Sequence, residues 1–370
     1  MRGDRSRQTS MLAVVNLDER VPKDHPLRAL KDLTEEALRG LEPVFESMYS
    51  KTGRPSIPPE RLLKSLLLMA LYSVRSERQF CDQLGYNLLF LWFLDMDLSE
   101  EPFSATSFSK NRSRFEKHQV AQEFFYAVVE RARRGGYLSS EHFSVDGTLI
   151  QAWGSNKSFR PKDEEGYDSG GFPDFRGEKR LNDTHASKTD PDARLYRKGR
   201  GREAKLSHMA HTLVENTHGL VVDAEVTAAT GTAEREAALT MLTRERQRRA
   251  KKRKAKKQQR SARKKNRRRA TVAADKAYDT KDFVKQCRRL GFTPHVAQKR
   301  YSAIDGRTTR HASYRTSLRK RLLVEKPFGW LKTTGNGRRS RYRGRDPTRQ
   351  SVFFGLTALN LLRIARLNAA

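Results

Sequence analysis

The sequence predicts an α/β fold, with a mixed sheet flanked by helices and preceded by an all-α N-terminal region. Helical periodicity dominates residues 1 to about 135, and the alternation typical of strands begins at His142. From His142 onward, strands and helices follow one another in turn, as in a sheet covered by helices. We therefore expect two domains, residues 1–135 and residues 136–370.

The N-terminal region contains amphipathic segments with helix start and stop signals. Between Pro58 and Tyr72 the apolar residues recur on one helical face, and proline suits the first turn of a helix. The segment that follows ends at Gly85, a natural C-cap. Helices are expected over residues 58–72, 76–84, 87–94, 104–115 (with Thr106 as N-cap) and 120–135.

The C-terminal region alternates strand-like and helical segments. Residues 143–150 alternate like a strand, and the polar stretch 154–205 predicts a long loop, which is usually functional or disordered. A turn at residues 216–219 indicates a hairpin. The other expected elements are strands at 206–214, 220–226, 270–274 and 293–297, and helices at 233–242, 280–290, 315–332 and 352–367.

Positive charge dominates the composition. Lysine and arginine number 75 against 43 aspartates and glutamates, a net charge of +32. Such a charge favours a polyanionic partner, and nucleic acid is the obvious one because bound phosphates release counterions. A membrane surface would require an amphipathic basic helix or a lipid anchor, and neither is clear, so we expect no membrane partner. Two cysteines far apart, Cys81 and Cys287, fit a reducing cytoplasm.

Half of the net charge lies in one tract, residues 244–269. Of its 26 residues, 17 are Lys or Arg and one, Glu245, is acidic. The tract is either a solvated, disordered run or an extension of the helix that begins at Ala233, since its residues are good helix formers. We favour binding to the DNA backbone, with order only on the DNA. The candidate contacts are Lys251, Lys252, Arg253, Lys254, Lys264, Lys265, Arg267 and Arg268.

The N-terminal helices leave two interpretations open with equal weight. They form either a helix-turn-helix, which places a recognition helix in the major groove, or a packing and dimerisation domain whose basic surface follows phosphates. The candidate DNA contacts are Lys110, Asn111, Arg112 and Arg114.

Three acids are distinguished by their positions. Asp146 lies within the first apolar strand, and Asp275 directly follows another. A carboxylate in such a place is costly unless it is paired or binds a metal. Glu325 lies between Arg321 and Lys332, and a continuous helix would project all three to one face.

Each acid alone also has a structural interpretation. Asp146 could form a turn, and Glu325 among basic neighbours could be an exposed ion pair. For Asp275 the odds are even, because Asp279 could be the ligand instead, or the N-cap of the next helix. The three in this order favour phosphodiester chemistry, in which carboxylates hold Mg²⁺ and two ions about 3.5–4 Å apart stabilise the attacking and leaving oxygens.

Three sequence blocks resemble those of bacterial insertion-sequence transposases of the DDE type, most of all the group usually numbered five. The blocks are Val145–Thr148, Ala274–Asp279 and Arg321-x3-Glu325-x6-Lys332, and the accessory motifs Lys51–Glu60 and Asn182–Ala193 also resemble that group. The likeness runs from about residue 10 to about residue 365, except for the basic tract. Leu318 stands where a Tyr is frequent, and Pro327 should kink the helix after Glu325.

The resemblance implies an RNase-H-like catalytic domain behind the helical domain. Asp146, Asp275 and Glu325 would be catalytic ligands of Mg²⁺ (or Mn²⁺), with two ions, and Arg321 and Lys332 would contact DNA nearby. The enzyme would bind the terminal inverted repeats, hydrolyse the DNA at the element's ends and join the 3′ ends to target DNA. Synapsis implies at least a homodimer on DNA, and the family implies a bacterial, cytoplasmic, nucleoid-associated protein.

A different class of function stays open beside this one. The chain could be a non-catalytic nucleic-acid-binding protein derived from a transposase, in which the basic tract carries the function and the carboxylates are relics. Deletion of residues 244–269 separates the two, because a binding module would lose all activity while a transposase would keep cleavage at low salt. A DNA/RNA hybrid nuclease is a third option, but such an enzyme needs no large helical N-terminal domain.

Overall fold

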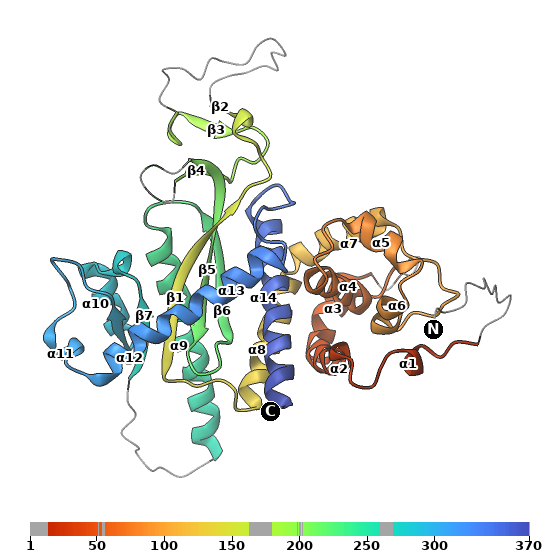
Figure 1. The fold of residues 1–370 in the computed structure, drawn as a ribbon, viewed down its shortest axis with the longest axis horizontal. Helices are drawn as coiled ribbons and strands as arrows, with labels where there is room; N and C mark the ends of the chain where they lie inside the picture. Colours follow the sequence, from red (N-terminus) through yellow and green to blue (C-terminus); the bar gives the residue numbers. More distant parts are fainter. Residues whose placement is uncertain are drawn as a thin grey trace, which may run out of the picture.

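A group of N-terminal helices packs beside an α/β core in the computed structural model (Figure 1). The structure describes residues 14–369 apart from 51, 54–55, 163–179, 198, 200, 202 and 260–268. The N-terminal elements are α1 (Leu17–Arg20), α2 (Pro26–Leu38), η1 (Arg39–Leu41), α3 (Glu42–Met48), α4 (Pro59–Leu71), α5 (Glu77–Leu84), α6 (Leu88–Leu94), α7 (Ala105–Lys117) and α8 (Val120–Arg134).

The core contains the strands and the remaining helices. The strands are β1 (His142–Gln151), β2 (Phe159–Pro161), β3 (His185–Ser187), β4 (Arg194–Tyr196), β5 (Lys205–Glu215), β6 (Val221–Ala228), β7 (Ala270–Ala274) and β8 (Phe292–Val296). The helices are η2 (Asn156–Ser158), α9 (Ala233–Gln259), η3 (Lys276–Tyr278), α10 (Lys281–Arg289), α11 (Gly306–Thr309), α12 (Ala312–Lys320), η4 (Arg321–Val324), α13 (Glu325–Thr333) and α14 (Arg345–Asn368).

The central sheet is mixed and is built around β1. On one side β1 pairs antiparallel with β5, which also pairs with β6 and β4. On the other side β1 pairs parallel with β7, and β7 pairs parallel with β8. The resulting order confirms the predicted fold class, an RNase-H-like mixed sheet flanked by helices and preceded by helices.

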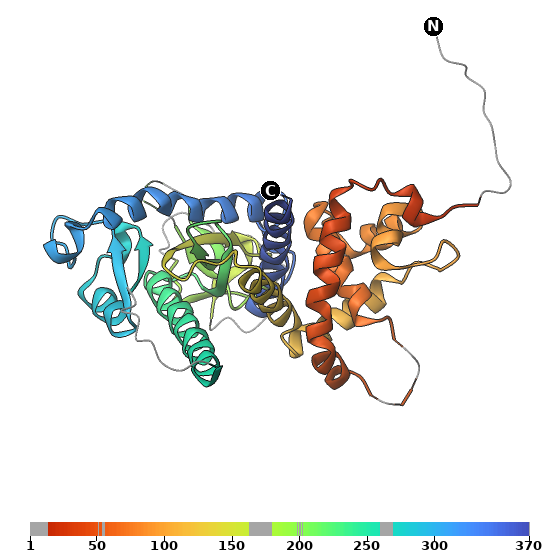
Figure 2. The same ribbon diagram turned by 90° about the horizontal axis from the view of Figure 1, so that it is seen from below.

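Helices cover both faces of this sheet. Helix α9 lies over β5, β6 and β1, while α12 and η4 lie over β7 and β1 on the opposite face (Figure 2). On the α9 side, Phe143 and Phe292 pack edge to face, and the Arg249 guanidinium lies over both rings. Because side chains alternate along a strand, Ser144 and Asp146 point to the side of α12 and η4.

Helix α14 connects the two parts of the molecule. It packs on α8, α4 and α2 and also on β6 (Figure 1). Phe353 contacts the Phe125 ring of α8, and the Asn360 amide bonds to both backbone groups of Val221 at 3.0 and 2.8 Å. One hydrophobic core therefore runs from the N-terminal helices into the sheet, and the domain boundary at residue 135 stays a prediction. Within the described residues, no helix is both long and apolar enough to cross a membrane.

Four expectations require correction. Ser104, and not Thr106, caps α7. The stretch 154–205 contains β2, β3 and β4 among its described residues, so it is more than a loop. The helical stretch 315–332 is divided by the 3₁₀ turn η4. Helix α9 continues to Gln259, which agrees with the helix extension for residues 244–259 of the basic tract and differs from a run without regular structure.

Candidate active site

Asp146 and Asp275 lie on neighbouring parallel strands. The register pairs Ser144 with Ala273, and each aspartate follows two residues later on its own strand. Two residues are one full repeat of a strand, so both carboxylates leave the sheet at the same level and on the same face. Neighbouring strands are about 4.8 Å apart, and strand pairing therefore brings the two aspartates together.

Backbone amides orient both carboxylates. The Asp146 carboxylate accepts a hydrogen bond from the Gly147 amide at 2.8 Å, and the Asp275 carboxylate accepts one from the Ala277 amide at 2.7 Å. Asp279, the alternative ligand, is 4% exposed and binds the amides of Lys299 and Ala303 at 2.8 and 2.9 Å. These bonds tie Asp279 to the chain after β8. Thr280, and not Asp279, caps α10, and the choice between Asp275 and Asp279 as a metal ligand stays a prediction.

A buried tyrosine lies near the two aspartates. Burial first, and then the negative charges of Glu234, Asp146 and Asp275, raise the pKa of Tyr278 well above its ordinary value. The Tyr278 hydroxyl therefore stays protonated at physiological pH. Tyr278 belongs to the second sequence block, whereas Glu234 carries no sequence signal beyond its place in the first turn of α9.

Gly147 allows other side chains to approach β1 beside Asp146. A Cβ atom at this position would lie 2.9 Å from the His211 Nδ1 atom and 3.0 Å from the Glu234 Cγ atom. His211 is fully buried, and burial lowers its pKa to about 3, so the ring is neutral. The absence of a side chain at Gly147 is thus required by packing behind the site.

Glu325 comes from the helical layer over the same face. η4 contacts β1 and β5, and Val324, its last residue, is fully buried. Glu325 begins α13 and is exposed, and it makes no hydrogen bond or ion pair with the described residues. No three His, Cys, Asp or Glu side chains of the described chain are grouped as a metal site. The single three-carboxylate cage expected from the sequence is therefore not formed in this arrangement.

The aspartate pair itself fits a divalent cation. Mg²⁺ prefers oxygen ligands, keeps several waters and is usually bound through one or two carboxylates together with substrate phosphates. Asp146 and Asp275 supply two such carboxylates from one edge of the sheet. Glu325, the third candidate, begins the helix that follows η4 over the same face and is not grouped with the pair.

Arg321 and Lys332 do not lie on one continuous α-helix. Arg321 belongs to η4 and Lys332 to α13, and the tighter 3₁₀ turn changes the facing of side chains. Pro327 lies in the first turn of α13, where proline is tolerated. The departure from a regular α-helix is therefore the 3₁₀ turn before Glu325, and not a kink after Glu325 as the sequence predicted. Lys332 lines a basic groove, and Arg321 is half-buried.

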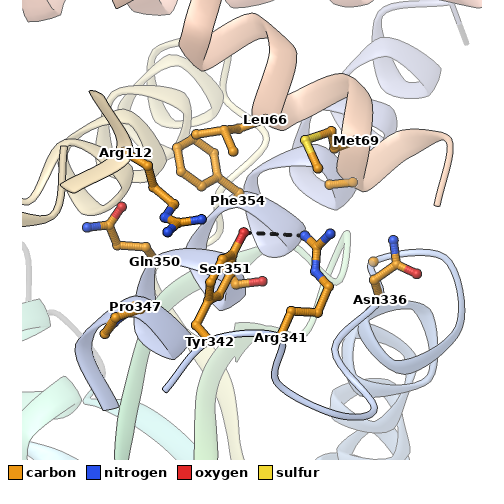
Figure 3. Close-up of a pocket in the computed structure, with 12 residues that line it drawn as sticks. Leu66, Met69, Arg112, Asn336, Arg341, Tyr342, Pro347, Gln350, Ser351 and Phe354 are labelled. Carbon is orange, nitrogen blue, oxygen red and sulfur yellow. Dashed lines mark hydrogen bonds between the residues drawn. The ribbon is translucent and has the colours of Figure 1, made fainter. Parts of the chain in front are cut away.

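The candidate DNA contacts of α7 differ in their surroundings. Lys110 and Arg114 are exposed, whereas Asn111 is 4% exposed. Arg112 forms an ion pair with Glu77 and lies 4.5 Å from the centre of the Tyr342 ring. It also lines a small pocket between α4 and α14 (Figure 3). Arg112 thus connects the helical region to the core, while the exposed pair stays a prediction for DNA contact.

The first part of the basic tract binds acids inside the protein. Arg244 pairs with fully buried Asp223 at 3.0 Å and with Glu225 at 2.8 Å. Arg249 pairs with buried Glu245 at 3.0 Å. These contacts anchor α9 on the sheet. Lys251 is exposed; Lys252, Arg253 and Lys254 lie on α9, and Lys264, Lys265, Arg267 and Arg268 lie outside the described residues.

Comparison with known proteins identifies the family. The transposase DDE domain family matches residues 138–361, and a transposase domain of the type DUF772 matches residues 15–114. The chain therefore belongs to the DDE transposases, a family of metal-dependent DNA-transposing enzymes. No curated protein matches the sequence.

Two solved structures are also similar, at low scores. One is the piggyBac transposase synaptic complex with hairpin DNA, at 10% identity and a TM-score of 0.37, covering 93% of this chain and 75% of that one. The other is the Mos1 mariner paired end complex with Mn, at 14% identity and a TM-score of 0.21, covering 94% and 97%. The family assignment rests on the sequence match and not on these likenesses.

Proposed function

We propose that this transposase binds the terminal inverted repeats of an insertion sequence, hydrolyses the DNA at the element's ends and joins the 3′ ends to target DNA. Asp146, Asp275 and Glu325 would hold two divalent ions. The observation that supports the proposal is the β1–β7 register, which pairs Ser144 with Ala273, two residues before Asp146 and Asp275 on their own strands. The proposal includes membership of the group of bacterial insertion-sequence transposases numbered five and a cytoplasmic, nucleoid-associated location. It also includes a homodimer on DNA, because synapsis joins two ends.

In this proposal the sheet supplies two of the metal-binding carboxylates, and the helical layer supplies the side chains that anchor the DNA. Divalent ions held by these carboxylates would supply Lewis-acid chemistry toward the scissile phosphate and the attacking water. Asp146 and Asp275 would hold the ions with carboxylates that are each oriented by one backbone amide. Arg321 and Lys332 flank Glu325 in the sequence and anchor the DNA backbone, which keeps the scissile phosphate in place.

The test uses DNA that flanks the gene and carries its inverted repeats. With Mg²⁺, Asp275→Asn should lower cleavage by at least about 1000-fold, because metal assistance is worth several kcal/mol. Binding to the same DNA, measured in EDTA, should change less than about twofold. Asp282→Asn is the matched control, since Asp282 is an exposed aspartate on α10, and it should cut normally. Equal cutting by Asp275→Asn and the parent would refute the proposal.

A further inference from the structure

A basic groove lies next to the end of β1. It encloses about 700 Å³. None of the described residues that line it is acidic. Its cationic and aromatic lining consists of Arg75, Trp153, Lys332, Arg338, Arg339 and Arg341. A groove with this lining favours a polyanion, since cations there repel one another until phosphates neutralise them.

One wall of the groove is fixed to the last residue of β1. The Gln151 amide donates to the Arg338 carbonyl at 3.2 Å, and the Ser340 amide donates to the Gln151 carbonyl at 2.7 Å. The Arg339 guanidinium donates to the Trp153 carbonyl at 2.8 Å. Residues 338–340 are therefore held by backbone hydrogen bonds at the end of β1, the strand that carries Asp146.

The other wall comes from the loop between α4 and α5. Ser73 donates to the Thr334 carbonyl at 2.9 Å, and Arg75 donates to the Asn336 side chain at 3.4 Å. Asn336 and Arg341 also line the pocket of about 30 Å³ between α4 and α14 (Figure 3). The groove is thus preformed where the N-terminal helices meet the catalytic core.

Trp153 gives the groove an aromatic surface. Its side chain is 44% exposed, and the Arg339 guanidinium lies 5.9 Å from the ring centre. Cationic grooves with exposed aromatic rings are typical of proteins that bind single strands, because each unpaired base offers a face for stacking. Bases inside a duplex already stack on one another and cannot use this ring.

We infer that the groove binds one unpaired DNA strand, with a base stacked on Trp153 and its phosphates on Arg338 and Arg341. The identity of this DNA strand rests on the proposed function: it is the DNA strand that runs past Asp146 and Asp275. Five residues separate Asp146 from Gln151, or about 17 Å along a strand. The wall of the groove that is fixed to Gln151 therefore lies about this far from Asp146, on the same strand.

The test measures binding of the full chain to a 12-nucleotide oligothymidylate and to a 12-base-pair duplex by fluorescence anisotropy in EDTA. Trp153→Ala should weaken binding of the single strand by about 5- to 100-fold, the range for loss of one stacked base. Trp153→Phe should restore most of it, and duplex binding should change less than about twofold. Tyr301→Ala, which removes an 87% exposed ring outside the groove, is the matched control and should bind like the parent.

Salt dependence tests the phosphate contacts. Arg338→Gln should lower the slope of log affinity against log salt for the single strand by about 0.7, and Arg307→Gln, an exposed arginine outside the groove, should leave it unchanged. Parental single-strand binding by Trp153→Ala, or an equal loss on duplex, would overturn the inference. Because EDTA prevents cleavage, a loss here together with full cutting by Asp275→Asn would refute the catalytic proposal and keep the groove.

Discussion

The sheet side and the helix side of the active site are built differently. Asp146 and Asp275 follow paired residues of neighbouring strands, and backbone amides hold both carboxylates. Glu325 lies at the junction of a 3₁₀ turn and a helix, exposed and without a bonded partner among the described residues. The difference shows that strand pairing alone positions two of the candidate ligands, whereas the position of the third candidate depends on how the helical layer packs over the sheet.

Substitution of one glycine on each side of the active site tests this comparison, and the larger effect is expected on the sheet side. In Gly147→Ala the new methyl group would lie 2.9 Å from the His211 ring and 3.0 Å from Glu234, so β1 must shift beside Asp146. A displacement of about 1 Å costs about 100-fold in rate, and we expect a loss of that size in DNA cleavage. Overpacking should also lower the free energy of unfolding by about 1–3 kcal/mol, as measured by urea denaturation.

The matched change on the helix side is Gly329→Ala. No atom lies within 4 Å of a Cβ at this position, and alanine is the better helix former by up to about 1 kcal/mol. This variant should cut DNA like the parent and resist urea slightly better. Equal activity of the two glycine variants would contradict the rigid-sheet description.

A smaller effect concerns the packing of the helical layer at low pH. His295 of β8 shares a hydrogen bond of 2.7 Å with Ser317 of α12, the helix that leads into η4. Burial, helped by the charges of His142 and His311, lowers the pKa of His295 to about 4 from its ordinary 6.5. Between pH 6.5 and about pH 4, His295 binds a proton in the unfolded chain but not in the folded chain. The free energy of unfolding is therefore unaffected by this group above pH 6.5 and falls as the pH decreases toward 4.

The corresponding measurement is urea unfolding at several pH values. One such proton changes the free energy of unfolding by up to about 1.4 kcal/mol per pH unit. His295→Asn keeps a polar atom near Ser317 but cannot titrate, so its pH dependence between 6 and 4.5 should be shallower by about that amount. A variant with the parental slope would show that another group controls acid stability.

The fold and the strand aspartates were predictable because their signals are local. Alternating apolar residues around Asp146 define β1, and a short, continuously buried run before Asp275 defines β7. The carboxyl ends of parallel neighbouring strands lie at the same edge of a sheet. The packing behind them was not predictable, because Glu234 and His211 approach Gly147 from elements far apart in the chain. The groove was not predictable from the sequence for the same reason, since Trp153 and Arg339 are nearly 190 residues apart in the chain and are joined by a tertiary hydrogen bond.

Charge counting alone does not show which cations of the tract 244–269 bind acids inside the protein. Arg244 and Arg249 neutralise the buried acids Asp223 and Glu245, and the DNA contacts expected from Lys251 onward stay predictions. A buried carboxylate without a partner is costly, and the position of these acids in space is not visible in the sequence. In the same way, η4 interrupts a stretch whose composition indicated a single helix.

The central claim, that the strand aspartates bind the catalytic ion, is tested most directly by exchanging an oxygen ligand for sulfur. Asp275→Cys should cut the element's ends at least about 1000-fold more slowly than the parent in Mg²⁺, which prefers oxygen. It should regain activity in Mn²⁺, which accepts a thiolate more readily. Asp282→Cys should cut like the parent with both ions. Undiminished cutting by Asp275→Cys in Mg²⁺ would contradict the claim.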